Sequence, residues 1–230
     1  MKQLARLAMA LSVTIGSTLS PGALRAQGTG ATVAVVAFNV RGARNDSIAE
    51  YAGVGTAIAD ILSADLRAAA GVRVVDRAPI GRTVALQART RQGFLGREGA
   101  VAAAKLLNAD HVVFGGFAAD AAGNVRIDAR AVNVATGVVE TTERLQGRGD
   151  DVVSLVQQLA ARLAGAMTVP AANSSAVSAV PLTALVTYGR ALEAIDRGER
   201  AQARQLLEGI VRDHPDFAPA RAALAAAGSS

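Results

Sequence analysis

The segment from Ala109 to Thr142 constrains the fold of this chain more than any other. Two runs of strand-forming residues flank the pair Gly123-Asn124, and the pair Thr136-Gly137 opens a third run. Gly and Asn between such runs predict tight turns that join antiparallel strands. The segment therefore predicts a meander of three antiparallel strands. It contains no group of residues typical of catalysis, which favours a binding or assembly module over an enzyme.

Strand and helix patterns alternate before this meander. Thr32–Phe38 is a continuous apolar run and predicts a strand buried on both faces. Asn39–Asp46 is polar and predicts a loop. Ser47 and Glu50 match a capping box, so we expect a helix to begin there and to end before Gly71, which suits a left-handed C-cap. Its apolar stripe comprises Tyr51, Val54, Ile58, Ile61, Leu62, Leu66 and Ala69.

The remaining patterns predict an α/β sandwich with one mixed sheet. Helical crossovers make the early strands parallel, and short turns make the late strands antiparallel. Val125, Ile127 and Ala129 alternate with Arg126, Asp128 and Arg130, which predicts a strand with one wet face that could bind a partner. Val132 and Val134 shift the apolar phase of the same strand, which predicts a bulge. The further expected elements are strands at Val72–Val75, His111–Phe117, Val125–Val134 and Val138–Arg144, and helices at Ala78–Arg91, Arg97–Asn108 and from Asp150 to about Leu163.

The first residues match the three parts of an export signal. Lys2 and Arg6 precede the mostly apolar run Leu7–Leu19, and Ala26 is a small residue at a suitable cleavage point. We therefore expect residues 1–26 to be a signal peptide, and the protein to be exported to the periplasm or to the periplasmic face of the outer membrane. Removal of the three basic residues of this segment lowers the formal charge from +5, so the basic isoelectric point alone does not indicate a polyanionic partner.

The amino-acid composition limits the kinds of partner and anchor that we expect. Aromatic residues make up 3% of the chain and Trp is absent, so little stacking surface exists for single-stranded nucleic acid and we expect no nucleic-acid partner. The chain has no Cys, so we expect neither disulfides nor a lipid-anchored cysteine. No apolar run after the signal is long enough for a membrane span.

Four short motifs, taken in order, resemble the TolB amino-terminal-like family, which includes the FlgO and CsgG-type envelope domains. They lie at Val33–Phe38, Val74–Arg77, Ala109–Gly115 and Asn133–Gly137. Asn133 and Ala135 depart from the family pattern, which often carries an acid in this turn. The resemblance covers about residues 31–167. It implies an α/β domain over residues 31–168 that acts by contact with other envelope proteins.

The C-terminal part follows a proline-bounded linker at residues 169–181 and resembles a single tetratricopeptide repeat over residues 182–227. One such repeat cannot bury its own apolar face, so it must pack on the sheet domain, dimerise, or receive a partner helix. We expect a partner-binding groove near Tyr188, Leu192 and Leu207. The residues that carry the resemblance are Tyr188, Gly198, Ala203, Leu207 and Pro215, and the expected helices are Leu182–Arg197, Arg200–Asp213 and Phe217–Ala226.

Patterns that could carry catalysis or bind a cofactor are weak. His111 follows Asp110, but no nucleophile motif accompanies the pair, and a strand-edge histidine is favoured. His214 precedes Pro215 at a helix end, where a cation suits the dipole. Two His and no Cys argue against zinc. Gly53-Val54-Gly55 lacks the third glycine of a phosphate loop, so close packing of its helix is favoured, and we expect no cofactor.

A run of arginines forms the one basic segment: Arg73, Arg77, Arg82, Arg89, Arg91 and Arg97. An ordinary solvated face is favoured. The alternative is peripheral contact with anionic envelope components, carried by Arg82, Arg89 and Arg91.

Taken together, these patterns predict an exported, non-enzymatic module that binds other proteins of the bacterial envelope through sheet and repeat surfaces, with self-association left open. One alternative is a subunit of a CsgG-like outer-membrane secretion assembly, although the alternating membrane hairpins of such subunits are not seen. A hydrolase resting on Asp110 and His111 is the less favoured alternative.

Overall fold

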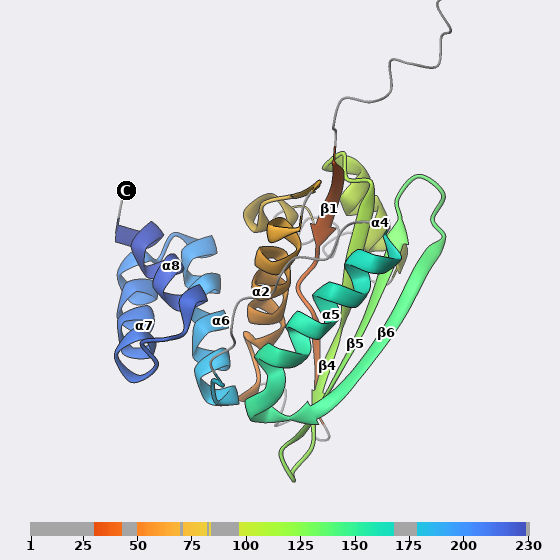
Figure 1. Cartoon of the computed structure of the whole chain (residues 1–230). Helices are drawn as coiled ribbons and strands as arrows, with labels where there is room; N and C mark the ends of the chain where they lie inside the picture. The colour runs from red at the N-terminus through yellow and green to blue at the C-terminus, as the bar shows by residue number, and fades with distance from the viewer. Residues whose placement is uncertain are drawn as a thin grey trace, which may run out of the picture.

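The computed structural model describes residues 30–42, 50–69, 71–81, 83, 97–167 and 179–228. Within these residues, six strands form one mixed sheet with helices on both sides (Figure 1). This is the predicted α/β class. The strands are β1 (Ala31–Val35), β2 (Asn39–Gly42), β3 (Val72–Val74), β4 (His111–Ala119), β5 (Asn124–Asn133) and β6 (Val139–Arg148).

The sheet has the order β3-β1-β4-β5-β6, with β2 pairing with β4 beyond the end of β1. The pairs of β1 with β3, β1 with β4 and β2 with β4 are parallel, whereas the pairs of β4 with β5 and β5 with β6 are antiparallel. The two predicted turns join the last three strands, and Gly123 and Gly137 adopt φ of 79° and 70°. The register of β5 with β6 shifts between Ala131 and Val132, which confirms the predicted bulge.

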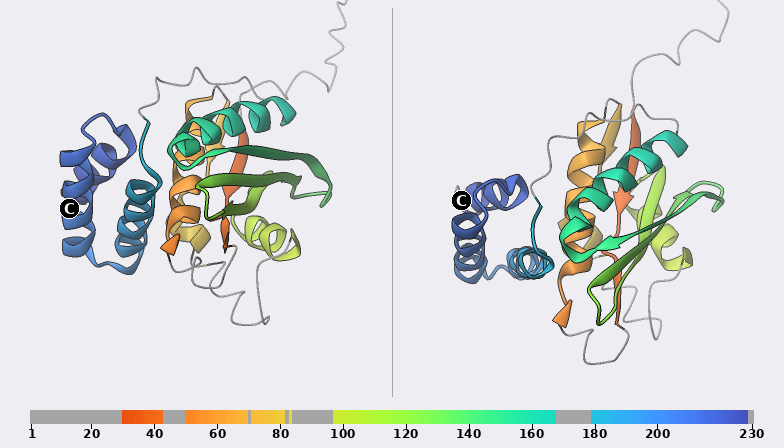
Figure 2. Two further views of the ribbon diagram at one scale, coloured as in Figure 1. Left: turned by 90° about the horizontal axis from the view of Figure 1, so that it is seen from below. Right: turned by 60° about the horizontal axis from the view of Figure 1, so that its bottom comes forward.

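Two helices seal one face of the sheet. They are α2 (Val54–Ala68) and α5 (Val152–Ala166), the second preceded by the short 3-10 helix η1 (Gly149–Asp151). Figure 2 shows α5 on one side of the long strands and α4 (Arg97–Leu106) on the other. The predicted stripe of α2 is buried apart from Tyr51, which is only partly covered.

The opposite face of the sheet is covered only in part. A small cluster of buried aliphatic residues lies between α4 and the start of β4, and its side chains are short because alanine predominates on the helix. The chain therefore packs α4 closely over this half of the face and leaves the other half without a helix among the described residues. The cluster comprises Ala34, Val36, Ile80, Ala100, Ala104, Ala109, Val112, Val132 and Val134.

The C-terminal helices form a further layer behind α2. They are α6 (Leu182–Arg197), α7 (Arg200–Asp213) and α8 (Ala218–Gly228), with α6 against α2 (Figure 1). Gly53 and Gly189 let the two backbones approach, because a Cβ on Gly189 would lie 1.9 Å from the Gly53 carbonyl oxygen. Of the three predicted ways to cover the repeat-like hairpin, the structure uses packing on the sheet domain.

One prediction about the first half of the chain needs correction. Residues 39–42 form strand β2 rather than a loop, because their backbone pairs in parallel with Gly116–Ala119. Glu50 is helical, and Gly53, with a left-handed φ of 95°, separates it from α2, which begins at Val54. Residues 47–49 of the predicted capping box, most of the predicted helix Ala78–Arg91 and the signal segment lie outside the described residues.

Candidate functional site

Strand β5 has one dry face and one wet face, as its alternating sequence predicts. Arg126 and Arg130 are exposed on the wet face, with the partly exposed Asp128 between them. The opposite face of the strand packs beneath α5 and α2 and is buried at every position. These buried residues are Val125, Ile127, Ala129 and Ala131.

The register of the neighbouring strands places further polar residues beside Arg126 and Asp128. Directly paired residues share one face of a sheet, so side chains from β2, β4, β5 and β6 form rows across the wet face. We call this surface the arginine face. Its three rows are Arg41, Ala118, Arg126 and Gln146; Asn39, Gly116, Asp128 and Arg144; and Phe114, Arg130 and Thr142.

Positive charge predominates on the arginine face. Asp128 is its one acid in these rows and lies between two arginines, with Oδ2 2.9 Å from the Nε of Arg126 and Oδ1 2.6 Å from the Nε of Arg144. Arg41 and Arg130 have no carboxylate of the described residues within ion-pair distance. The guanidinium groups of Arg41 and Arg130 therefore add to the positive charge of the arginine face.

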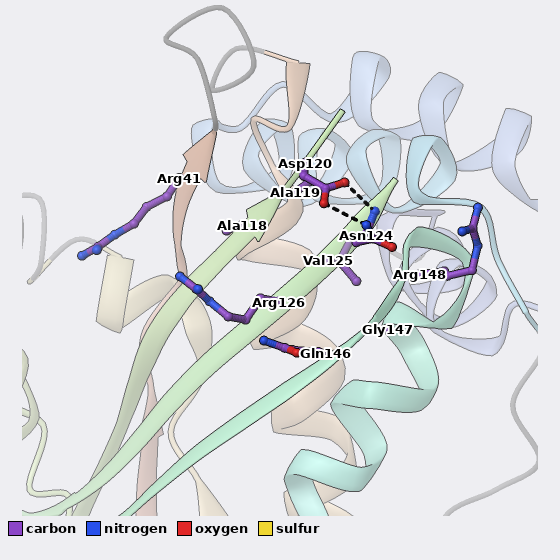
Figure 3. A pocket seen from close by; sticks show the side chains of 10 residues that line it. All are labelled: Arg41, Ala118, Ala119, Asp120, Asn124, Val125, Arg126, Gln146, Gly147 and Arg148. Atoms are coloured by element: carbon purple, nitrogen blue, oxygen red, sulfur yellow. Dashed lines mark hydrogen bonds between the residues drawn. The ribbon is translucent and has the colours of Figure 1, made fainter. Parts of the chain in front are cut away.

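Short side chains on β4 hollow the centre of the arginine face. Gly116 and Ala118 form the floor between the longer side chains of Arg41 and Arg126. Two adjoining hollows of about 370 Å³ and about 770 Å³ share Arg41, Ala118 and Arg126, and Gly116 lines the smaller one. In Figure 3, Arg41 and Arg126 project toward the same side of the strands, whereas Arg148, at the end of β6, lies apart from them. The surface is thus a shallow trough with guanidinium walls.

The hairpin between β4 and β5 closes one end of the trough. Asp120 accepts hydrogen bonds from the backbone and side chain of Asn124 and from the backbone of Ala122 (Figure 3). The side-chain hydrogen bond from Asn124 is the main reason that the pKa of Asp120 lies below its usual value. Asp120 therefore stabilises the turn between β4 and β5.

The residues predicted to line a groove on the repeat lie in the interior instead. Tyr188, Leu192 and Leu207 are no more than 3% exposed, because α6 packs on α2 and α7 packs on α6. The Tyr188 hydroxyl donates to Asp60 Oδ2 at 2.7 Å, and its ring meets Phe217 edge-on. The side chains of Tyr188, Leu192 and Leu207 therefore pack between the helical layers and offer no exposed surface to a partner.

The predicted arginine run divides in two. Arg82, Arg89 and Arg91 lie outside the described residues. Arg73 donates to the hydroxyl of Thr32, and Arg77 contacts Asp60, Asp196 and the Leu192 carbonyl. These two arginines therefore join β3 to β1 and the sheet domain to α6.

Asp110 and His111 do not face each other as a catalytic pair. Asp110 Oδ2 accepts the backbone N–H of Thr32 at 2.8 Å, and His111 Nδ1 lies 2.7 Å from Glu140 Oε2. His214 caps the end of α7, as predicted. Among the residues that the structure describes, no three His, Cys, Asp or Glu side chains are grouped to bind a metal ion.

Sequence reasoning found the wet side of β5 but missed the surface as a whole. The alternation of Arg126, Asp128 and Arg130 was the available signal. Arg41 lies in a segment predicted to be a loop, and Arg144 is the last residue of a predicted strand. Neither residue can therefore be placed beside Arg126 until the strand register is known.

Comparison with known proteins gives partial structural likenesses only. No family model and no curated protein matches the chain. TolB from Acinetobacter baumannii is similar over 60% of this chain and 28% of its own, with 12% identity and a TM-score of 0.40. The LpoB C-terminal domain from Escherichia coli covers 53% of this chain and 85% of its own, with 15% identity and a TM-score of 0.36.

A third similar structure is lipoprotein GNA1162 from Neisseria meningitidis, with 16% identity, a TM-score of 0.38, and coverage of 64% of this chain and 99% of its own. The chain spans less than a third of the TolB structure. At these identities and TM-scores the likenesses assign neither a family nor an activity. None of the helices in the described ranges combines the length and hydropathy needed to cross a bilayer.

Proposed function

We propose that this chain is an exported, non-enzymatic module of the bacterial cell envelope that binds another envelope protein through the arginine face. The observation that carries the proposal is the open half of the sheet, where β2, β5 and β6 present Arg41, Arg126, Arg130 and Arg144 without a covering helix among the described residues. The export signal predicted at residues 1–26 supports the location.

The chemistry of the face favours a partner with carboxylates. A guanidinium group binds a carboxylate through parallel N–H donors, which gives orientation as well as attraction. Asp128 already uses this chemistry within the protein, since it pairs with Arg126 and Arg144. A partner that presents acids at similar positions would meet Arg41 and Arg130, which lack such a pair among the described residues.

Photo-crosslinking in the native envelope tests this proposal. A crosslinking amino acid replaces Thr142, which is exposed within the arginine face, and a matched variant carries it at Gln205, which lies on α7. We expect Thr142 to give a defined adduct with one envelope protein, and Gln205 to give none with that protein. The same adduct is expected to disappear when Arg126→Glu and Arg130→Glu are introduced, because charge reversal repels an acidic partner.

The outcome against the proposal is equally definite. If the adduct at Thr142 survives the double charge reversal, or if both positions give the same adducts, the arginine face is not the binding surface. Export is tested separately. The protein is isolated from the periplasmic fraction and the mass of its N-terminal peptide is measured, and export predicts the loss of residues 1–26.

A further inference from the structure

We propose that the partner binds as an extended strand along the free edge of β6 and places alternate acidic side chains over the arginine face. The proposal rests on the function proposed above and names the form of its partner. Strand β6 pairs with β5 on one side, and no described strand pairs with its other side. Its ten residues are enough for a regular ladder with a second chain.

The direction of the β6 backbone groups follows from one hydrogen bond. Gly149 donates its N–H to the Gly123 carbonyl at 3.0 Å, immediately beyond the paired residues Asn124 and Arg148. In an antiparallel pair the bonded residues alternate. Leu145 and its odd-numbered neighbours therefore bond to β5. The backbone groups that point to the free edge belong to Thr142, Arg144 and Gln146.

Free backbone groups and the arginine face share the same residues. Thr142, Arg144 and Gln146 are exposed, and they lie in the three rows that contain Arg130, Asp128 and Arg126. A strand added at this edge would extend each row by one residue, about 5 Å from β6. Its alternate side chains would project over the same face as Arg144, within reach of guanidinium groups on a long flexible stem.

The charge of the face decides which strand fits. A strand with acids at alternate positions would place them beside Arg144 and toward Arg126 and Arg130, whereas a basic strand would be repelled. The opposite side of the same edge carries Thr141 and Glu143, so neutral polar residues suit the other alternate positions. The complementary segment is therefore acidic and polar in alternation.

This chain contains no such segment outside the described residues. Those segments contain seven basic residues, and their one acid is Asp46. Residues 168–178, which include most of the linker, have no charged residue. None of these segments supplies the alternating acids, so the occupant comes from another protein.

A peptide-binding experiment tests this mode directly. The probe is a fluorescent peptide that alternates glutamate and threonine and is about nine residues long, to match the length of β6. The control peptide has the same sequence with N-methyl groups on alternate backbone amides, so that its charge is kept and its ladder bonds are lost. We expect fluorescence anisotropy to show binding of the first peptide and at least about tenfold weaker binding of the second.

Two variants of the protein separate the edge from the charge. Gln146→Pro removes an outward N–H without removing an arginine, and proline is tolerated on an edge strand. Arg144→Gln removes a charge and keeps the backbone. Each of these two variants is expected to weaken peptide binding about tenfold. The control variant is Gln205→Ala on α7, because proline at this position would break the helix. Circular dichroism and thermal melting establish that each variant is folded.

Each remaining result contradicts the strand mode in a distinct way. Equal binding of the N-methylated peptide or of polyglutamate shows a charge-driven polyanion site. Unchanged binding by a folded Gln146→Pro variant excludes the β6 edge. A dimer that Gln146→Pro dissociates, without peptide binding, shows that β6 pairs with a second copy. Any of these outcomes overturns this inference, while the crosslink at Thr142 and its loss on charge reversal would still support the arginine face as a protein-binding surface.

Discussion

The two faces of the sheet differ sharply although the same strands build both. Along β5, Ile127 is fully buried beneath the helices, whereas the neighbouring Arg126 is exposed on the other side. One face is sealed by α2 and α5 and backed by α6, and the other is half covered by α4. The buried and the exposed side chains of β5 thus alternate with a period of two residues.

The difference teaches where substitutions can be tolerated. On the sealed face a side chain touches two layers, so its loss leaves a cavity that the fold cannot close fully. On the arginine face a side chain meets solvent, and its replacement changes the charge that a partner encounters. Stability measurements and binding measurements are therefore expected to respond to different residues of the same strand.

The largest expected effect comes from a pair of neighbouring substitutions on β5. Ile127→Ala removes a fully buried side chain and is expected to lower the free energy of unfolding by about 2–5 kcal/mol. Arg126→Ala is its matched control on the opposite face and is expected to change it by about 0.5 kcal/mol or less. Urea unfolding followed by circular dichroism measures both. Equal losses would show that the arginine face also carries the stability of the fold.

A smaller loss of stability is expected from a substitution that tests whether the packing of α6 on α2 stabilises the sheet domain. Gly189→Ala would place a Cβ 1.9 Å from the Gly53 carbonyl oxygen, so α6 must shift on α2, at an expected loss of about 1–3 kcal/mol. Gly165→Ala on α5 is the control, since its Cβ would meet nothing within 4 Å and helix propensity favours alanine. Thermal melting compares them. If both variants melt alike, the C-terminal helices do not stabilise the sheet domain.

The smallest expected effect concerns Asp65, an acidic residue of α2 on the mostly apolar sealed side. Burial raises its pKa from 3.8 to about 6, and its Oδ2 has no hydrogen-bond partner among the described residues. The folded protein therefore keeps this proton when the unfolded chain has lost it, so stability falls as pH rises from about 4 to about 6 and stays lower above that range.

Asp65→Asn should remove this pH-dependent loss. Because the carboxyl is only about half buried, the expected gain at pH 7 is about 1 kcal/mol, with little gain at pH 4. Melting temperatures at the two pH values measure the difference between variant and parent. An equal gain at both would mean that the buried charge is not the cause.

Much of the fold could be predicted because its signals are local. The turns at Gly123 and Gly137, the bulge near Val132 and the helices Leu182–Arg197 and Arg200–Asp213 each depend on a few neighbouring residues. Periodicity of two or of 3.6 reports which side of an element is apolar. Strand β2 was missed because four polar and small residues become a strand only when β4 is beside them.

The candidate site was predicted less well because its parts come from different strands. The sequence by itself determined that Arg126 and Arg130 share one face of β5, since alternate residues of a strand must do so. Only the tertiary structure decided that Arg41 and Arg144 lie beside them, since register joins residues far apart in the chain. It likewise decided that Tyr188 is interior, because a helical stripe shows that a side chain is apolar but not which layer will cover it.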